Sequence, residues 1–318
     1  NKQQIKQITK LQDTNEQKIK SIEKNKKQNQ LLKARISSFK GRYIEILWKT
    51  EVDKLKQIEV INETQSSKSI RVIKNGENCV LKILKGNIDE EQFRKLKYMI
   101  NEQQSPYISQ VIGISYGDEN NSPSILSHFY PHNLKEIVMR MNPIQKVCCI
   151  YEICSSMEMI HSKGLIHRRL RPWKILFDEN GHVVINDLFA SHVMDNRLLF
   201  EPHLNRDDIL FMAPEVLLEE DIRYDKKIDV YSFGYILYYI LNDGTLPEFR
   251  IKYISNYIIL NFPQTFNEIS RNLISRCLSY QEQRPSFNEI IKYIEENNFN
   301  LIDGIENSIT EIKDFLLI

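Results

Sequence analysis

One stretch near the middle of the chain constrains the fold more than any other. It begins at His167 with a cationic loop, HRRLRPWK, in which four basic side chains fall within seven residues and Pro172 excludes a regular helix. An apolar run, the turn residues Asp-Glu-Asn-Gly and a second apolar run then lead to Asp187. Asn-Gly between two apolar runs is typical of a β-hairpin. We therefore predict a two-stranded ribbon that brings the cationic loop and the Asp187 carboxylate to one edge.

The order of these residues resembles the catalytic loop of eukaryotic protein kinases, which reads His-Arg-Asp-Leu, then Asn, then Asp-Phe-Gly. The departures fall on the residues that carry the chemistry. Arg169 stands where the family has its catalytic aspartate, and Lys174 stands where it has a metal-binding asparagine. Asp187 keeps its place, but Leu and Phe follow it instead of Phe and Gly. The resemblance therefore implies a kinase fold with a rewritten catalytic loop.

Other landmarks of the kinase family occur in order between about residues 58 and 297. Lys82 ends a Cys-Val-Leu-Lys run that resembles the strand carrying the phosphate-contacting lysine. Ser127 falls at the gatekeeper position, where a small side chain leaves the base pocket open. The resemblance assigns nucleotide-binding roles to Lys82, Ser127, Asp187 and Lys174.

Four positions match the family in residues that support its fold. We expect His167 to be a packed core histidine rather than a base. Glu215, in Ala-Pro-Glu, is expected to form an ion pair with Arg284, in Arg-Pro-Ser-Phe. Asp229 opens an Asp-x-x-Ser-x-Gly motif and is expected to cap the backbone near the catalytic loop.

The expected nucleotide site lacks two features of the family. The stretch that follows Ile61 contains no glycine, although the family's glycines let backbone N–H groups approach the phosphates. In the helix predicted over about 90–101, Leu96 falls where the family has the glutamate that pairs with its lysine, so we expect that pair to be absent. These departures count against tight ATP binding of the usual kind.

Asp187 is the remaining candidate metal ligand, and the alternative is a closed salt bridge with Lys174 or Lys82. Lys174 places a cation where the family binds a divalent ion, and like charges repel. We therefore expect that ATP or ADP, if either binds, binds without magnesium. Its phosphates would then be neutralised by Lys82, Lys174 and Arg169.

The segment between Asp187 and Glu215 resembles a kinase activation segment. It has no Ser, Thr or Tyr from His192 onwards, and none occurs before Arg223, so phosphorylation within that window cannot switch the protein. Asp208 occupies the position that normally carries a substrate-facing threonine.

We predict an α+β, bilobal protein-kinase fold, with a β-rich small lobe over about 58–130 and a helical large lobe over about 131–297. Residues 1–57 are predicted to form a basic helical extension, and residues 298–318 a helical tail. Within the extension, isoleucines at heptad spacing give a weak coiled-coil pattern, and a second helix is predicted over about 38–57. These isoleucines are Ile5, Ile8, Ile19 and Ile22.

The charge is divided unevenly along the chain. Of its 43 basic and 42 acidic side chains, residues 1–40 hold 11 and 3, a net charge of +8, which leaves −7 on the rest. A basic arm on an acidic body suggests a self-contact, a partner surface or an anionic membrane, but we favour the simpler explanation, a solvated Lys-rich helix. Because the arm has few aromatic side chains for stacking, we expect no nucleic-acid partner.

Three further features bear on location. The longest apolar run, Tyr235 to Leu241, is too short to span a bilayer, so a membrane association is not expected. Five cysteines, without metal-binding spacing, indicate reduced thiols and a cytoplasmic protein. The chain shows no signal-peptide pattern, and because it begins with Asn we expect it to be a fragment of a longer protein.

Three hypotheses for function follow. The first is a pseudokinase, similar to the tyrosine-kinase-like serine/threonine group, that acts as a signalling scaffold or allosteric partner through its lobe surface and N-terminal helix. The second is an enzyme, either an atypical active protein serine/threonine kinase or another ATP-binding phosphotransferase. The third makes the arm the main element, with residues 1–57 driving self-association.

Overall fold

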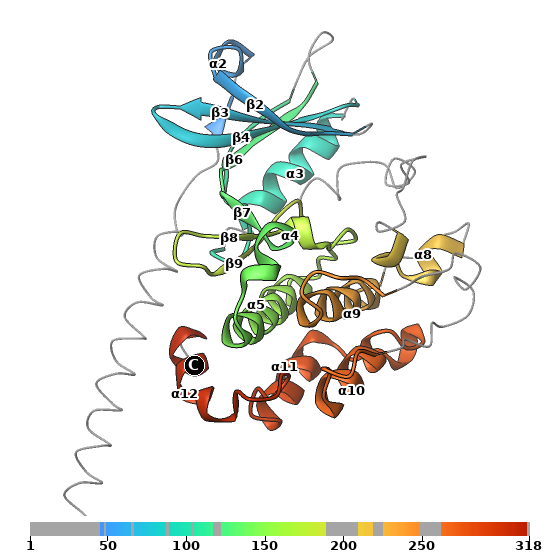
Figure 1. Ribbon diagram of the computed structural model, residues 1–318. Helices are drawn as coiled ribbons and strands as arrows, with labels where there is room; N and C mark the ends of the chain where they lie inside the picture. The colour runs from blue at the N-terminus through green and yellow to red at the C-terminus, as the bar shows by residue number, and fades with distance from the viewer. Residues whose placement is uncertain are drawn as a thin grey trace, which may run out of the picture.

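The computed structural model describes residues 45–47, 49–64, 67–86, 89–102, 105–116, 122–188, 209–218, 225–247 and 262–316. These residues form an upper lobe built around a twisted sheet and a lower lobe of helices (Figure 1). The α+β bilobal kinase fold predicted from the sequence is therefore confirmed. The arm helix predicted over residues 1–36 and the substrate-facing position Asp208 lie outside the described residues.

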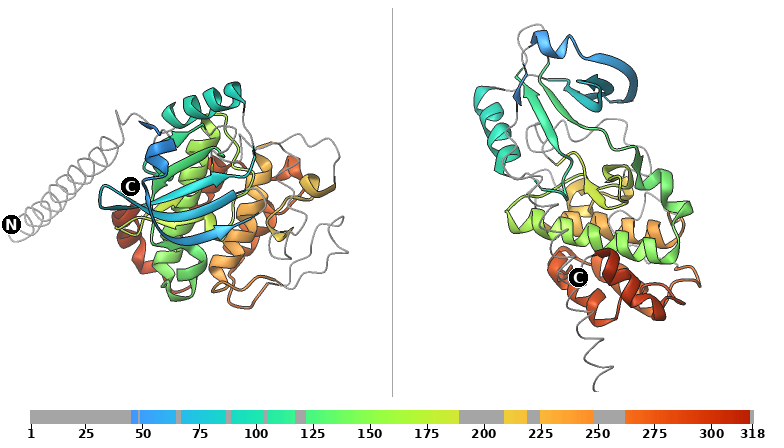
Figure 2. Two further views of the ribbon diagram at one scale, coloured as in Figure 1. Left: turned by 90° about the horizontal axis from the view of Figure 1, so that it is seen from above. Right: turned by 90° about the vertical axis from the view of Figure 1, so that its left-hand side faces the viewer.

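The small lobe contains a six-stranded sheet in the order β1-β5-β6-β4-β3-β2, in which β1 is parallel to β5 and the other neighbours are antiparallel. Helix α3, Glu90–Glu102, lies beside this sheet (Figure 2). The strands are β1 Glu45–Ile46, β2 Lys56–Glu63, β3 Ser67–Lys74, β4 Glu77–Leu84, β5 Val111–Ser115 and β6 Ser124–His128. The β-rich small lobe predicted over about 58–130 is thus present.

The β3–β4 hairpin shows why this part of the sequence was readable. Lys74 pairs with Glu77, and the two residues between them, Asn75 and Gly76, have φ angles of 52° and 86°. Both angles lie in the left-handed region, which a two-residue hairpin turn requires and which Asn and Gly adopt at little cost.

The helix predicted over about 38–57 is wrong for its described residues. They form strand β1, the four-residue helix α2 at Lys49–Val52 and the start of β2. The physical reason is burial: Leu47, only 4% exposed, packs with Ile70, Val72 and other apolar residues of the small-lobe sheet. Apolar residues that could form one face of a helix instead cover this sheet.

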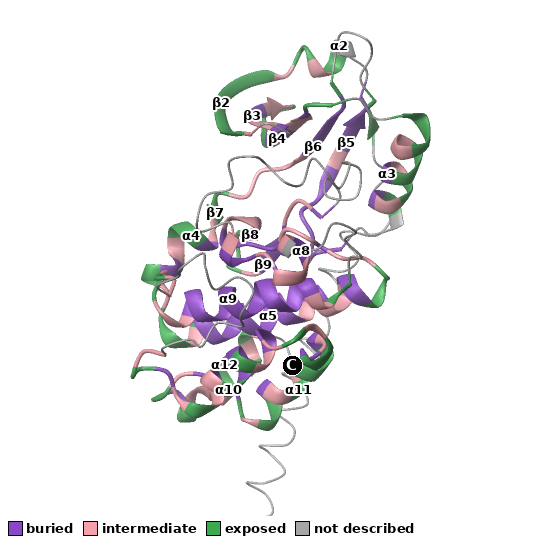
Figure 3. Cartoon of the chain, turned by 90° about the vertical axis from the view of Figure 1, so that its right-hand side faces the viewer, coloured by how far each residue is buried: buried purple, intermediate pink, exposed green. Residues whose placement is uncertain are grey.

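The large lobe is organised around two buried helices, α5 at Pro143–Ser162 and α9 at Lys227–Leu241 (Figure 3). Helix α5 begins with a capping box between Asn142 and Gln145, with Pro143 in its first turn. Every residue from Ile228 to Ile240 is buried, as its nearly uninterrupted apolar sequence predicts.

Shorter elements surround these two helices. The remaining α-helices are α4 Leu134–Ile137, α8 Pro214–Leu218, α10 Glu268–Cys277, α11 Phe287–Glu296 and α12 Ile309–Leu316. The 3-10 helices are η1 Val138–Arg140, η2 Pro172–Lys174, η5 Gln281–Gln283 and η6 Glu306–Ser308. Three strands, β7 His132–Asn133, β8 Ile175–Phe177 and β9 Val183–Ile185, form a second sheet.

The C-terminal tail ends in a helix, as the sequence predicted. Helix α12 packs against α5 through Ile312, which is fully buried, and the ring of Phe315 lies 4.7 Å from that of His182. None of the helices in the described ranges is long and apolar enough to cross a membrane.

Gly113 should decide whether the N-terminal segment can dock on the sheet. A Cβ atom at this position would lie 2.8 Å from Cγ of Leu47 and 3.2 Å from the carbonyl oxygen of Glu45. We expect Gly113→Ala to lower the free energy of unfolding by about 1–3 kcal/mol, because β1 must shift away from β5. Urea denaturation measures this change.

The matched control is Gly86→Ala, because nothing lies within 4 Å of a Cβ atom built there. Equal stability of the two variants would show that β1 does not depend on close contact with β5.

Candidate functional site

The predicted ribbon is formed by β8 and β9, which pair in an antiparallel register from Ile175 opposite Ile185. Asp178 closes the turn, because its carboxylate accepts hydrogen bonds from the backbone N–H groups of Asn180 and His182, each at 2.9 Å. At the other end, the N–H of Asn186 donates to the carbonyl of Lys174 over 2.9 Å. This bond holds the cationic loop beside Asp187, at one edge of the ribbon.

Asp229 fixes the backbone of the cationic loop through hydrogen bonds to its carboxylate. Its carboxylate is fully buried and accepts hydrogen bonds from the N–H groups of His167 at 2.7 Å and Arg168 at 2.8 Å. The Nε2 atom of His161 lies 2.9 Å from the same carboxylate. Arg168 has a φ angle of 69°, so this carboxylate stabilises a backbone conformation that few non-glycine residues adopt.

His167 is completely buried, and its two ring nitrogens are both used. Nε2 lies 2.9 Å from the carbonyl oxygen of Asn186, and Nδ1 accepts from the N–H of Arg169 at 3.3 Å. Burial lowers the pKa of His167 below its usual value. A neutral imidazole protonated on Nε2 satisfies both bonds, and its place is that of an architectural residue.

Asp187 lies between two lysines that come from different lobes. Lys82, on β4, binds one of its carboxylate oxygens, and Lys174, in η2, binds the other. The three side chains are between 15% and 19% exposed. The sequence left open which lysine would close the salt bridge, and in the structure both do.

The protonation of this group follows from its charges. Burial would raise the pKa of Asp187, but Lys174 and Lys82 bring it well below its usual value, so the carboxylate stays ionised. Burial lowers the pKa of Lys82 to about 8, and Lys174 and Arg169 act in the same direction while Asp187 opposes them. Two ammonium groups therefore share one carboxylate, and Arg169 is a third cation, which acts on Lys82.

The residues present do not fit the metal ions that protein kinases use. Those enzymes hold Mg²⁺ with the aspartate at the position of Asp187 and the asparagine at the position of Lys174. Here both oxygens of the carboxylate are bound by ammonium groups, and a protonated lysine has no lone pair to offer a metal. Across the described ranges, no group of three or more His, Cys, Asp or Glu side chains could hold a metal ion.

Helix α3 supplies no carboxylate to Lys82 among the described residues. Leu96, at the position of the family's glutamate, is 1% exposed and lies in the main hydrophobic core. The two glutamates at the start of the helix pair with residues one turn later, Glu90 with Arg94 and Glu91 with Lys95, on the exposed surface.

Ser127 and Lys82 lie on neighbouring strands. In the β4–β6 ladder, Ser127 is opposite Val80, and Lys82 is opposite Ile125. The side chain of Ser127 is half-buried. The predicted gatekeeper position thus lies in the same sheet as Lys82, opposite the residue two positions before this lysine.

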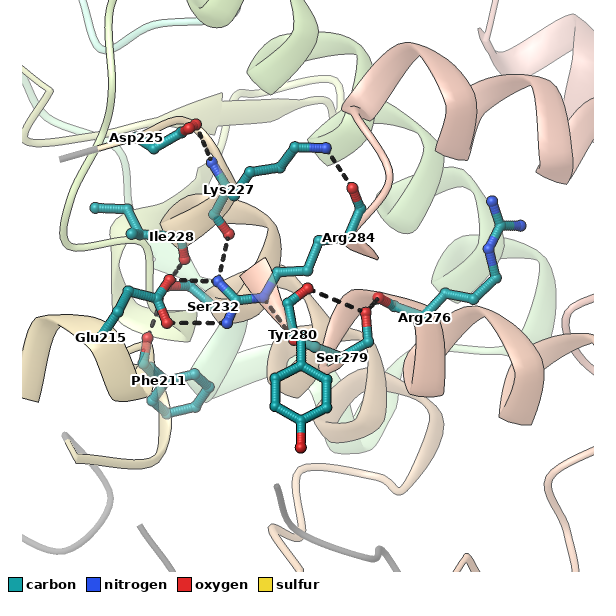
Figure 4. Close-up of polar contacts among 10 residues, drawn as sticks. All are labelled: Phe211, Glu215, Asp225, Lys227, Ile228, Ser232, Arg276, Ser279, Tyr280 and Arg284. Carbon is teal, nitrogen blue, oxygen red and sulfur yellow. Dashed lines mark hydrogen bonds and ion pairs between the residues drawn. The ribbon is translucent and has the colours of Figure 1, made fainter. Parts of the chain in front are cut away.

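The activation segment ends in a buried ion pair, shown in Figure 4. Arg284, with a fully buried side chain, donates to both carboxylate oxygens of Glu215, at 2.5 and 3.0 Å. Its other N–H groups donate to the carbonyls of Ser279 at 2.9 Å and Lys227 at 3.1 Å. This pair links α8, after the activation segment, to the loop before α11.

One buried carboxylate near the ribbon was not singled out from the sequence. Glu152, on α5, accepts from the N–H of Val183 at 2.8 Å, and its other oxygen lies 2.6 Å from Nδ1 of His182. It positions the ribbon on α5. The signal was a single glutamate within the otherwise apolar run from Val147 to Cys154.

Comparison with known proteins agrees with this geometry. The family model described as protein tyrosine and serine/threonine kinase matches residues 59–294. The cAMP-dependent protein kinase type 3 of Saccharomyces cerevisiae is 34% identical over 173 residues, which are 47% of this chain and 41% of the yeast protein. The dual specificity protein kinase pyk3 of Dictyostelium discoideum is 27% identical over 237 residues, or 70% of this chain and 17% of that protein. The chain thus spans less than half the length of these curated relatives.

The fold and the site define a domain of the protein-kinase class. Because the family match covers most of its length, the chain belongs to the protein tyrosine and serine/threonine kinase family.

The depressed pKa of Lys82 predicts an unusual dependence of stability on pH. Between about pH 8 and the pKa of an unfolded lysine near 10.4, the unfolded chain holds one more proton at this residue than the folded chain. Stability therefore rises with pH in this window. Relative to Lys82→Met, we expect the wild-type chain to gain on the order of 2 kcal/mol between pH 7.5 and pH 10.

Urea denaturation of both proteins at the two pH values measures the gain, and other titrating groups cancel in the difference. As a control, Lys292→Met on the exposed surface of α11 should track the wild-type protein at both values. A constant difference between wild type and Lys82→Met would show that the pKa of Lys82 is not depressed.

Proposed function

We propose that this chain is a pseudokinase, a protein-kinase fold that binds partners and does not transfer phosphate. The observation that carries the proposal is the salt bridge of Asp187 with both Lys82 and Lys174. The same carboxylate that would hold a metal ion in an active kinase is here engaged by the protein's own cations.

The chemistry of phosphoryl transfer supports this proposal. The reaction needs a carboxylate that orients the attacking hydroxyl group and metal ions that hold the phosphates. Arg169, at the position of that carboxylate, cannot accept a proton or a hydrogen bond, because a guanidinium group has no acceptor. Lys174 removes the second metal ligand. Two separate requirements of catalysis are therefore lost in one loop.

A nucleotide remains compatible with this site if its phosphates are neutralised without a metal. Lys174 and Arg169 both act electrostatically on Lys82, which supports a site where the three cations act on the same phosphates. We propose that ATP or ADP, when bound, is held by these three side chains, and that magnesium adds nothing to its affinity.

We further propose that the protein acts in the cytoplasm as a signalling scaffold or allosteric partner. Its five cysteines are all buried free thiols, which suits a reducing compartment. We propose that it resembles the tyrosine-kinase-like serine/threonine group, and that partners bind the lobe surfaces and the basic N-terminal arm. Self-association through the arm is part of this proposal.

The competing function is an atypical active serine/threonine kinase. One observation favours it: Asp187 is retained and is contacted by Lys82, from the strand that supplies the phosphate-binding lysine in active kinases. The names of the relatives, which are protein kinases, also favour it. It requires that a nucleotide and a metal displace Lys174 from Asp187.

A thermal-shift titration with ATP, ADP and adenosine separates these functions. We expect ATP and ADP to raise the melting temperature equally with magnesium and with EDTA, since the cations replace the metal. In Arg169→Asp/Lys174→Asn, an oxygen of Asp187 is released and a metal ligand is restored. The shift with ATP should then depend on magnesium and reach a few degrees at saturating ligand.

The control is Lys85→Asn, which removes a lysine that pairs with Glu63 on the exposed surface. It should behave as the wild-type protein does. Strict magnesium dependence of the wild-type shift, together with phosphate transfer to a protein substrate, would overturn the pseudokinase proposal.

A further inference from the structure

Strand β2 is an exposed edge strand along its whole length. It is the last strand of the six-stranded sheet, and all eight of its residues, Lys56–Glu63, are exposed (Figure 3). Ile58, Val60 and Ile61 are between 45% and 53% exposed, which is unusual for large apolar side chains on neighbouring positions. An edge strand presents backbone N–H and C=O groups to which another strand can bind.

The sequence of β2, KQIEVINE, is complementary to itself. When two copies are placed antiparallel about the point between Glu59 and Val60, three of the four distinct facing pairs bring residues of complementary kind together. The facing pairs are Lys56 with Glu63, Gln57 with Asn62, Ile58 with Ile61, and Glu59 with Val60. Opposite charges, two amides and two apolar side chains thus meet at positions where cross-strand pairs stabilise a sheet.

The two β-bulges of β2 are placed symmetrically about the same two-fold axis. Its pairing with β3 skips one residue between Gln57 and Glu59 and another between Val60 and Asn62. The residues skipped are Ile58 and Ile61, which are the apolar pair that the two-fold axis brings together. Bulges usually protect an edge strand because they disrupt its register. Here the bulge at Ile58 would face the bulge at Ile61 of the second copy, and the reverse at the other position, so the register is kept.

We propose that β2 is a dimerisation surface, and that its occupant is β2 of a second copy of this chain in antiparallel, two-fold symmetric pairing. Such an interface is isologous, because the same residues contribute from both copies. A strand of eight residues is about 27 Å long, and one pair of such strands buries less area than a standard stable interface. The dimer is therefore weak and depends on protein concentration.

The proposed dimer surface and the candidate site belong to the same sheet. Strand β2 pairs with β3, and β3 pairs with β4, which carries Lys82. At the end of β2, Glu63 already binds Lys68 and Lys85, so the Lys56 of the second copy would be the third cation at this exposed carboxylate. The inference does not depend on whether this site binds a nucleotide.

A charge exchange tests the pairing. In a two-fold dimer, Lys56→Glu places like charges at both ends of the interface, and so does Glu63→Lys. We expect each variant alone to raise the dissociation constant of the dimer about tenfold or more. In an equimolar mixture of the two variants, both ends regain opposite charges, and the heterodimer should form within about threefold of the wild-type affinity.

Sedimentation velocity of the full chain over a concentration series measures these constants, and thermal denaturation verifies that the variants fold. Lys292→Glu, on the exposed surface of α11, is the matched control and should leave the dimer unchanged. Three results would overturn the proposal: a wild-type chain that stays monomeric at the highest concentration, single variants that associate as the wild type does, or a mixture that fails to recover. If the single variants associate as the wild type does, self-association must use another surface, such as the N-terminal arm.

Discussion

The contact on which the functional conclusion depends is one carboxylate shared by two lysines. Asp187 is held between Lys82 from the small lobe and Lys174 from the cationic loop. The carboxylate therefore links the two lobes. A buried carboxylate with a single lysine partner would be a neutral pair. With two, the group carries a net positive charge in a partly desolvated place, and burial lowers the pKa of Lys82.

The rest of the large lobe holds this arrangement in place without taking part in it. Asp229 fixes the start of the cationic loop, His167 spans from that loop to Asn186, and Glu152 attaches the ribbon to α5. These buried groups have their hydrogen-bonding partners within the fold. Among the described residues, those that support the family's fold therefore keep their contacts. Arg169 and Lys174 stand where the family has its catalytic aspartate and its metal-binding asparagine.

Much of the fold could be predicted from the sequence because its signals are local. Asn75-Gly76 fixes a hairpin, the cap at Asn142 starts α5, and the apolar run after Ile228 reads as a buried helix. The sharing of Asp187 between two lysines could not be predicted, since Lys82 is 105 residues away and either lysine alone would satisfy the pattern.

The largest error in the sequence-based prediction, the helix over about 38–57, has a single cause. An apolar residue such as Leu47 reads the same way whether it lies on a helix face or covers a sheet. Only the long-range contact with β5, made close by Gly113, decides between them. Local sequence carries no information about that contact.

The position of β1 also shows that the folded domain begins before the residues that match the family model. The family match begins at residue 59, yet β1 ends at Ile46 and pairs with β5. A recombinant domain cut at the homology boundary would leave the edge of β5 open and would expose the apolar cluster that Leu47 covers. Such a protein would have a second exposed edge strand, β5, at the opposite edge of the sheet from β2. Aggregation of this protein would then be caused by the missing segment and would not be a property of the natural chain.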